Sequence, residues 1–425
     1  MLEKLLDSLK KAFDPTETAT LPDPFDTYYD EKAKLFCIGE LPLNIKKEAA
    51  RMIETKLDSN ESFDRASLDS LQLSAKGREV FDTALAQLCF WIGKLVGTKK
   101  RRKGDSLYPW KCAVCLVPTT RFNAWVRLSF DEKENTALIF LNIGVLLENL
   151  DRLHRIHATP GYLDSIINGS KGKLAPEVPT DQCDGYLANF SANPRLHAIA
   201  TEVAIKASML VVFHEYAHFI CGHVSYLKAE LDHSEGIHEA PEELDKVLAE
   251  ELRRHMEFDA DETAGTMASI FWREFDHPAV APEDMKNEAF SIEVILAVLS
   301  NNLILGQYLL DQRYYSPLWR AQHLLERFYA DFFYIDKSLP RHEQENARES
   351  NSNEMFRLQM KLVSELERAY KMLGLGEGLS FEYLTREINT LLSHDQHELE
   401  RFRTEFRKYS PATHFIQRGQ GQTQY

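Results

Sequence analysis

The sequence predicts an α+β protein that is mostly helical and contains one small antiparallel sheet. Apolar residues recur at helical spacing along most of the 425 residues, and strand-like patterns are confined to Lys111–Ile143. A hydrophobic fraction of 44% and a charged fraction of 27% are typical of a globular chain. The net charge of −15 argues against nucleic acid as a partner, because phosphates are bound by Lys and Arg.

Three segments are expected to form the sheet. FNAWVRLSF, residues 122–130, alternates between apolar and polar side chains, which predicts a strand with one buried face. A charged stretch separates it from the apolar TALIFLNI, residues 136–143, so the pair is expected to form an antiparallel hairpin. KCAVCLVP, residues 111–118, is the expected third strand.

Four regions are expected along the chain. Residues 1–104 form an N-terminal helical region, residues 105–280 hold the sheet and the polar helices described below, residues 281–337 are helices that complete this core, and residues 338–425 are charged helices and a tail. The N-terminus lacks the pattern of a secretory signal, and the most apolar later stretch, 291–310, is interrupted by polar residues. We therefore expect no membrane span. Because the six cysteines are scattered without disulfide spacing, we also expect a cytoplasmic protein.

One predicted helix, running from about Leu196 and ending near Gly222, carries the stretch HEYAH inside an apolar run. Buried ionisable groups are costly unless something binds them. His214 and His218 lie about 40° apart on one helical face, where two imidazoles can bind one metal ion. Glu215 flanks that position, as the general base for a metal-activated water must. HEYAH therefore predicts a Zn²⁺ cofactor and a catalytic Glu215 that water and substrate reach.

Catalytic zinc usually takes three protein ligands. The preferred third ligand is Glu257 in EFDADETAG, and Asp261, one turn later on the same face, is placed to hydrogen-bond a ligand histidine. Asp259 lies about 200° from Glu257 and is expected to point elsewhere. His223 lies about 180° from His214 around the helix, which favours a supporting role over ligation. Other third ligands remain open in or beside the acidic connector: Asp232, His233, Glu235, His238 and His255.

HEYAHFICGH followed by EFDAD is similar to the signature of the gluzincin metallopeptidases. Among these it most resembles soluble relatives of the membrane-processing zincins and the bacterial phage-exclusion peptidase family represented by Lit. The similarity covers residues 211–268. It implies a zincin-like core made of a small sheet, an active-site helix and a second metal-ligand helix, followed by a helical C-terminal subdomain. It also implies hydrolysis of an intracellular protein or peptide that pairs with an edge strand, either 122–130 or 136–143.

The expected hydrolysis also needs a group that stabilises the oxyanion. RYYSPLWRAQH supplies the candidates Tyr314, Tyr315, Arg320 and His323, of which Tyr315 and His323 are preferred as catalytic residues. The loop at residues 160–194 and the acidic connector at 228–251 are expected to gate the cleft. A regulatory partner and a trigger in stress or phage defence follow only by analogy, and the oligomeric state stays open.

Two other function classes remain open. One is a zinc-stabilised regulatory or binding protein without catalysis, for which loss of Glu215 would leave binding intact. The other is a hydrolase that acts on an electrophile other than a peptide bond.

Overall fold

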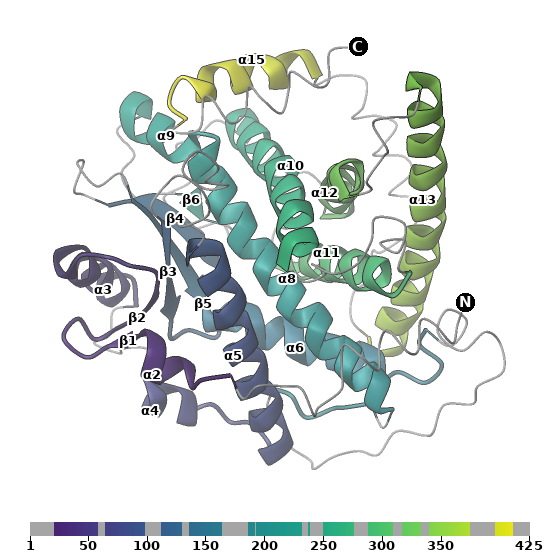
Figure 1. Cartoon of the computed structure of the whole chain (residues 1–425). Helices are drawn as coiled ribbons and strands as arrows, with labels where there is room; N and C mark the ends of the chain where they lie inside the picture. The colour runs from purple at the N-terminus through teal and green to yellow at the C-terminus, as the bar shows by residue number, and fades with distance from the viewer. Residues whose placement is uncertain are drawn as a thin grey trace.

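The structure is a computed structural model of the chain, and it describes residues 21–57, 64–97, 112–129, 136–163, 186–191, 193–231, 237–238, 250–275, 288–308, 317–332, 340–374 and 396–410. In these ranges the protein is mostly helical and contains one mixed sheet (Figure 1). The expected α+β class is confirmed at this level.

The sheet has the strand order β1-β2-β3-β5-β4-β6. The expected hairpin is confirmed, because β4 and β5 pair antiparallel with Val126 opposite Ile139. The expected third strand, β3, is also present, but it runs parallel to β5. A purely antiparallel sheet is therefore wrong, since the returning strand β5 inserts between β3 and β4. The strands are β1 Tyr29–Asp30, β2 Leu35–Ile38, β3 Cys112–Val117, β4 Ala124–Leu128, β5 Ala137–Asn142 and β6 Ile237–His238.

The N-terminal region is not only helical, because it supplies β1 and β2. Ile38 of β2 lies opposite Val114 of β3 in an antiparallel pair. The run LFCI that forms β2 is only four residues long. Periodicity cannot distinguish so short an apolar run from a piece of helix, so its strand character depends on the neighbour with which it pairs.

Both faces of the sheet are buried. Helix α3, Leu43–Leu57, lies on the face opposite α8, Pro194–Ile220 (Figure 1). Under α3, Trp125 is only 4% exposed and stacks on Phe140 with ring centroids 4.9 Å apart. The expectation that β4 has one solvent-exposed face is therefore wrong, because an N-terminal helix covers it.

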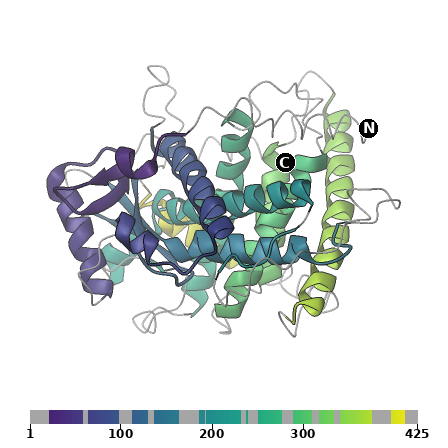
Figure 2. The ribbon, with the colours of Figure 1, turned by 90° about the horizontal axis from the view of Figure 1, so that it is seen from below.

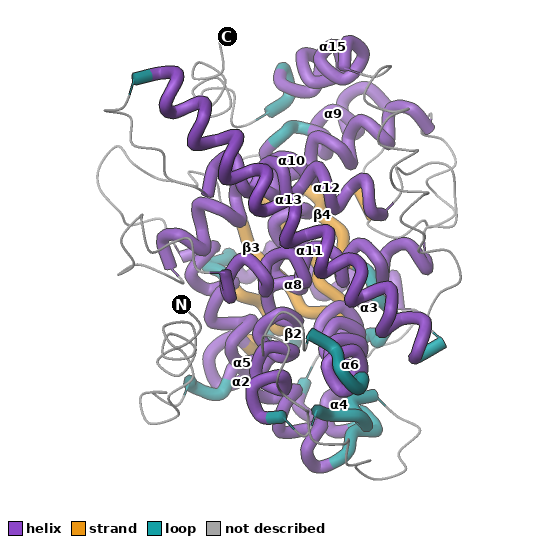
Figure 3. Tube along the Cα trace, turned by 90° about the vertical axis from the view of Figure 1, so that its right-hand side faces the viewer, coloured by secondary structure: helices purple, strands orange, loops and turns teal. Residues whose placement is uncertain are grey.

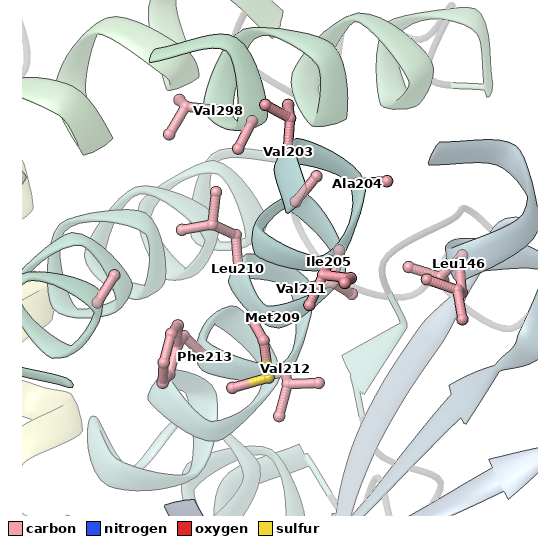
Figure 4. Packing of buried hydrophobic residues seen from close by; sticks show 14 of the residues in the cluster. Leu146, Val203, Ala204, Ile205, Met209, Leu210, Val211, Val212, Phe213 and Val298 are labelled. Atoms are coloured by element: carbon pink, nitrogen blue, oxygen red, sulfur yellow. The ribbon is translucent and has the colours of Figure 1, made fainter. Parts of the chain in front are cut away.

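Helix α8 lies at the centre of the molecule. It packs against α6, α10 and α11, and its apolar side chains leave it on several sides (Figure 4). Leu146 of α6 and Val298 of α11 belong to the same buried cluster as Leu210 and Val211 of α8. A helix that is apolar all round is one that neighbours enclose on all sides.

The other helices are arranged around α8. Helices α10, α11 and α12 lie beyond α8 from the sheet, α13 lies at the end of the molecule opposite α3, and α15 lies over α9 and the adjacent end of α10 (Figures 1, 2 and 3). The helices not yet bounded are α2 Pro24–Tyr28, α4 Arg65–Asp69, α5 Ala75–Gly97, α6 Ile143–Ala158, α9 His223–Leu231, α10 Glu250–Phe275, α11 Glu288–Tyr308, α12 Pro317–Phe332, α13 Arg341–Met372 and α15 Gln396–Arg407.

Two helical segments, Ala75–Gly97 and Leu196–Ile220, are long and apolar enough to cross a membrane by length and composition. In the second, 78% of the most apolar window is buried inside the protein, as in a core helix. The absence of a membrane span stays a prediction. The five cysteines in the described ranges are all free thiols.

Candidate metal centre

The chain turns sharply after the helix that carries HEYAH. Helix α8 ends at Ile220, and Gly222 has a φ of +87°, a left-handed conformation that favours glycine. The expected end at Gly222 is therefore confirmed. His223 begins a new helix, α9, and does not continue the spiral of α8.

Helices α8 and α10 bring three side chains together. His214 Nε2 lies 3.0 Å from His218 Nε2 and 3.2 Å from Glu257 Oε2. His218 Nε2 lies 3.8 Å from Glu257 Oε1. All three side chains are buried and form a group that could hold a metal ion. The sequence expectation that Glu257 joins the two histidines agrees with this arrangement.

The two imidazole nitrogens and the Glu257 carboxylate have a spacing that zinc accepts. Zn–N and Zn–O bonds of about 2.1 Å at tetrahedral angles separate two ligand atoms by roughly 3.4 Å. The two Nε2 atoms are 3.0 Å apart, and each lies close to one oxygen of Glu257, at 3.2 Å from Oε2 for His214 and at 3.8 Å from Oε1 for His218, so the separations lie on both sides of that value. Two imidazole nitrogens and one carboxylate also form a donor set that zinc accepts. The residues present therefore fit the ion.

Asp261 fixes the ring of His214. His214 Nδ1 lies 2.9 Å from Asp261 Oδ1 and donates its proton to it, because an ionised carboxylate only accepts. This leaves the lone pair of His214 on Nε2, the atom that faces His218 and Glu257. Burial by itself would raise the pKa of Asp261, but Arg320 and the hydrogen bond from His214 outweigh it and lower the pKa to about 2.

Arg320 of α12 lies against two carboxylates of this site, those of Glu257 and Asp261. Its Nε donates to Asp261 Oδ2 at 2.7 Å, and its Nη2 donates to Asp261 Oδ1 at 3.0 Å and to Glu257 Oε2 at 3.2 Å. The guanidinium is buried, so it compensates two buried negative charges. The sequence suggested Arg320 for the oxyanion, whereas its contacts here are with Glu257 and Asp261.

Of the two preferred oxyanion groups, only His323 lies within the described residues. His323 lies one turn after Arg320, and its ring packs on Phe258 and Trp319 at centroid distances of 4.5 and 4.0 Å. Burial lowers its pKa to about 4. Tyr315 lies outside the described residues. The oxyanion role of either residue stays a prediction.

His223 supports His218 from α9. His218 Nδ1 lies 2.9 Å from His223 Nδ1, and His223 Nε2 lies 3.3 Å from Asp259 Oδ2. Asp259 does point away from His214 and Glu257, as expected, but it ends against His223. The supporting position of His223 agrees with the sequence reasoning, although the cause differs, because the chain turns at Gly222 and the ring is not carried around α8.

These hydrogen bonds determine the tautomer of His218. Asp259 accepts the proton of His223 Nε2, so His223 Nδ1 keeps a lone pair and accepts from His218 Nδ1. His218 Nε2 is then left with its lone pair, 3.0 Å from the lone pair of His214 Nε2 and close to Glu257. Two lone pairs beside a carboxylate repel one another unless a cation lies between them. Burial, followed by the neighbouring His214, lowers the pKa of His218 well below its usual value, which disfavours a proton as that cation.

Cys221, His223 and Asp259 form a second group that could hold a metal ion. Cys221 Sγ lies 3.2 Å from Thr263 Oγ1, and burial, followed by the charge of Asp259, raises the pKa of its thiol well above the usual range. Arg403 of α15 donates from Nε to Asp259 Oδ1 at 2.8 Å. The second group thus touches both the first group, through His223, and the C-terminal helix.

Glu215 lies beside the ligands on α8 and is 0% exposed. His214, His218 and Glu257 are also buried. The expectation that solvent and substrate reach Glu215 is therefore wrong for this structure. The expected gates at 160–194 and 228–251 lie largely outside the described residues, as do three of the rival ligands, Asp232, His233 and Glu235.

Two rival ligands lie within the described ranges. His255 stacks on Phe402 of α15, with ring centroids 4.7 Å apart. His238 belongs to β6, where its backbone pairs with Trp125 of β4.

Searches of family models, curated proteins and solved structures return no match for this chain.

Some residues of this site carried no signal in the sequence. Arg403 is separated from HEYAH by most of the C-terminal half, and nothing in its own segment distinguishes it from other arginines. Cys221 was assigned to no site, and Asp259 was expected to point away. Only the turn at Gly222, which the sequence did predict, hints that the residues following α8 come back against it.

Proposed function

We propose that this protein is a zinc-dependent endopeptidase with a zincin-like core, and that it hydrolyses peptide bonds of an intracellular protein. The observation that supports this most strongly is the convergence of His214 Nε2, His218 Nε2 and Glu257 on one point, with separations of 3.0 to 3.8 Å. The Nε2 atom of each ring carries a lone pair there. The proton of His214 is on Nδ1, which faces Asp261, and the proton of His218 is on Nδ1, which donates to His223. His223 in turn donates to Asp259.

In this proposal His214, His218 and Glu257 hold the ion, and Asp261 and His223 orient the two rings. Zinc in such a site supplies Lewis acidity toward a carbonyl oxygen and toward water. Glu215 is the general base, since it lies next to His214 on the helix and its carboxylate can take a proton from water. Arg320 donates hydrogen bonds to Glu257 Oε2 and to Asp261 Oδ1, so it holds both carboxylates in place beside the two rings.

The proposed peptide site follows the sheet. Strand β5 lies between β3 and β4, so its edges are taken, and the expectation that residues 136–143 form an edge strand is wrong. Strand β4 pairs on its outer side with β6 at Trp125 and Val126. A peptide that adds to β4 would therefore have to replace β6, a two-residue strand from the acidic connector. In this proposal, substrate and water reach the buried Glu215 only after β6 has left β4.

The second candidate is a zinc-stabilised regulatory or binding protein without turnover. The complete burial of Glu215 is the observation that favours it, because a catalytic base must meet water. The two candidates share the metal site and differ in what Glu215 does. A cytoplasmic location, a regulatory partner and the absence of nucleic-acid and membrane partners belong to both proposals.

Elemental analysis of the purified protein tests the first step. We expect about one zinc per chain in the parent and in Glu215→Gln, and loss of zinc in Glu257→Ala, because Glu257 is a ligand and Glu215 is not. No zinc in the parent after zinc is supplied would overturn both candidates.

Cleavage assays on a proteome-derived peptide library then separate the two candidates. Cleavage by the parent and its loss in Glu215→Gln, at unchanged zinc content, would support the peptidase. If neither the zinc-loaded parent nor the zinc-loaded Ile237→Pro variant, in which β6 is disrupted, cleaves any peptide, the non-catalytic candidate is supported.

A further inference from the structure

The C-terminal helix α15 lies against the turn that follows the metal-ligand helix. Phe406 packs its ring on His223 at a centroid distance of 4.7 Å, and the hydroxyl of Ser410 donates to the carbonyl of Ile220. A side chain at Gly222 would bring its Cβ to 2.5 Å from the carbonyl oxygen of Phe406. The turn and α15 therefore pack backbone against backbone, which only glycine permits.

Arg403 connects α15 to the polar groups below this turn. Its Nε donates to Asp259 Oδ1 at 2.8 Å, and its Nη2 donates to Glu262. The other oxygen of Asp259, Oδ2, lies 3.3 Å from His223 Nε2. A continuous chain of contacts thus runs from Arg403 through Asp259 and His223 to His218, whose Nε2 faces His214 and Glu257.

The second group of metal-ligand residues can be interpreted in two ways. Cys221, His223 and Asp259 could bind a second ion, or His223 and Asp259 could serve the first site alone. The single proton between His218 Nδ1 and His223 Nδ1 distinguishes these two interpretations. A metal on His223 Nε2 would force a proton onto His223 Nδ1, which would then donate to His218 Nδ1. His218 Nε2 would have to carry the other proton and would be lost as a ligand.

With neutral imidazoles, the two groups therefore cannot hold metal ions at the same time. The raised pKa of the Cys221 thiol agrees with this, because the thiolate is the form that binds metal.

We propose that α15 is a positioning element of the metal site, and that Arg403 acts through Asp259 and His223 to hold the His218 ring in the tautomer that ligates. This inference rests on the zinc binding of the proposed function, and it gives the C-terminal helix a role in that site. Arg403 is a positioning residue, since it acts on the ligand His218 through Asp259 and His223. Outer partners of this kind typically change metal affinity by about 10- to 100-fold.

The test measures zinc affinity of the full-length protein by competition with a chromophoric chelator. We expect Arg403→Gln and Asp259→Asn to weaken zinc binding by about 10- to 100-fold and Arg403→Lys by less, because lysine keeps the charge. The matched control is Arg401→Gln, which removes the same charge from an exposed position on α15 and should change affinity by less than about twofold.

A double-mutant cycle distinguishes this route from a general loss of structure. If Arg403 acts through His223, then Arg403→Gln should weaken zinc by less than about threefold in a His223→Gln background. Equal effects of Arg403→Gln in both backgrounds would overturn the inference, even if the variant is less stable. Circular dichroism and melting of each variant check that it folds.

Cobalt substitution tests the choice between relay and second metal site. We expect one Co²⁺ per chain, with no sulfur-to-cobalt charge-transfer band, and a visible spectrum that changes in Asp259→Asn. Two ions per chain, with a charge-transfer band that disappears in Cys221→Ser, would overturn the inference and assign a second site. A parent that binds neither metal would instead refute the proposed function, and a parent that binds zinc as tightly as Arg403→Gln would refute only the role of α15.

Discussion

At the scale of single residues, three carboxylates of α10 divide the work of the candidate site. Glu257 faces the two histidine Nε2 atoms, Asp261 holds His214, and Asp259 holds His223. Residues four apart on a helix share a face, whereas a residue two positions from both of them points to the opposite side of the helix. The spacing in EFDAD therefore places Glu257 and Asp261 on the face of α10 toward His214, and Asp259 on the side toward His223.

Arg320 compensates two of these carboxylates, which predicts a large effect of its removal. We expect Arg320→Gln to lower the unfolding free energy of the metal-free protein by roughly 3–5 kcal/mol, because it leaves Glu257 and Asp261 buried without their cation. Urea denaturation in the presence of a chelator measures the change. The control is Arg327→Gln on the same helix, whose Nε donates to the hydroxyl of Thr266 and which should cost about 1 kcal/mol. Equal effects of the two variants would refute the charge argument.

At the scale of elements, the turn between α8 and α9 decides which residues meet the metal ligands. A continuous helix would carry His223 to the far side of α8, and the break at Gly222 returns it to His218 instead. The same break lets α15 pack on the backbone of the turn. Gly222 therefore determines both the contact of His223 with His218 and the packing of α15 against the turn.

We expect Gly222→Ala to be more harmful than the same substitution elsewhere in the left-handed region. Gly374 also has a positive φ, +65°, but an added Cβ there meets nothing within 4 Å. Gly374→Ala should therefore cost only the backbone term of about 1–2 kcal/mol. Gly222→Ala adds a collision with Phe406, so its urea midpoint should fall further and the protection of α15 from hydrogen exchange should decrease. Similar midpoints for the two variants would contradict the close packing at Gly222.

At the scale of the whole molecule, stability should depend on pH through histidines buried away from the metal site. His157 of α6 is fully buried, with Nδ1 at 2.8 Å from the carbonyl oxygen of Leu153, and burial lowers its pKa from 6.5 to about 4. The unfolded chain takes up a proton near pH 6.5 and the folded chain only near pH 4. The stability that neutral His157 supports is therefore present above pH 6.5 and is lost as the pH falls toward 4.

Replacement of this ring should reduce the acid sensitivity. Between pH 7 and pH 5, His157→Phe should lose about 2 kcal/mol less stability than the parent, because phenylalanine does not titrate. Urea midpoints of both proteins at the two pH values give the difference, in which contributions from other histidines cancel. The same replacement at exposed His342 serves as the control and should leave the parent's pH dependence unchanged. A parent and a His157→Phe variant with the same pH dependence would contradict the prediction.

The sequence by itself determined the features that depend on neighbours along the chain. Helical spacing placed His214 and His218 on one face and Glu257 and Asp261 on another, and alternation together with turn residues identified the hairpin of β4 and β5. These are local patterns, since side chains one turn apart meet in any α-helix. The left-handed glycine that ends α8 was readable for the same reason.

Only the tertiary structure decided the features that depend on distant segments. The parallel pairing of β3 with β5, the cover of Trp125 by α3 and the burial of Glu215 each depend on which elements pack together. The contacts of Arg320 and Arg403 with carboxylates of α10 join residues far apart in the chain, and no local pattern distinguishes such arginines from others. Periodicity encodes the face that a side chain occupies, whereas the partner of that face is set by the packing of the whole chain.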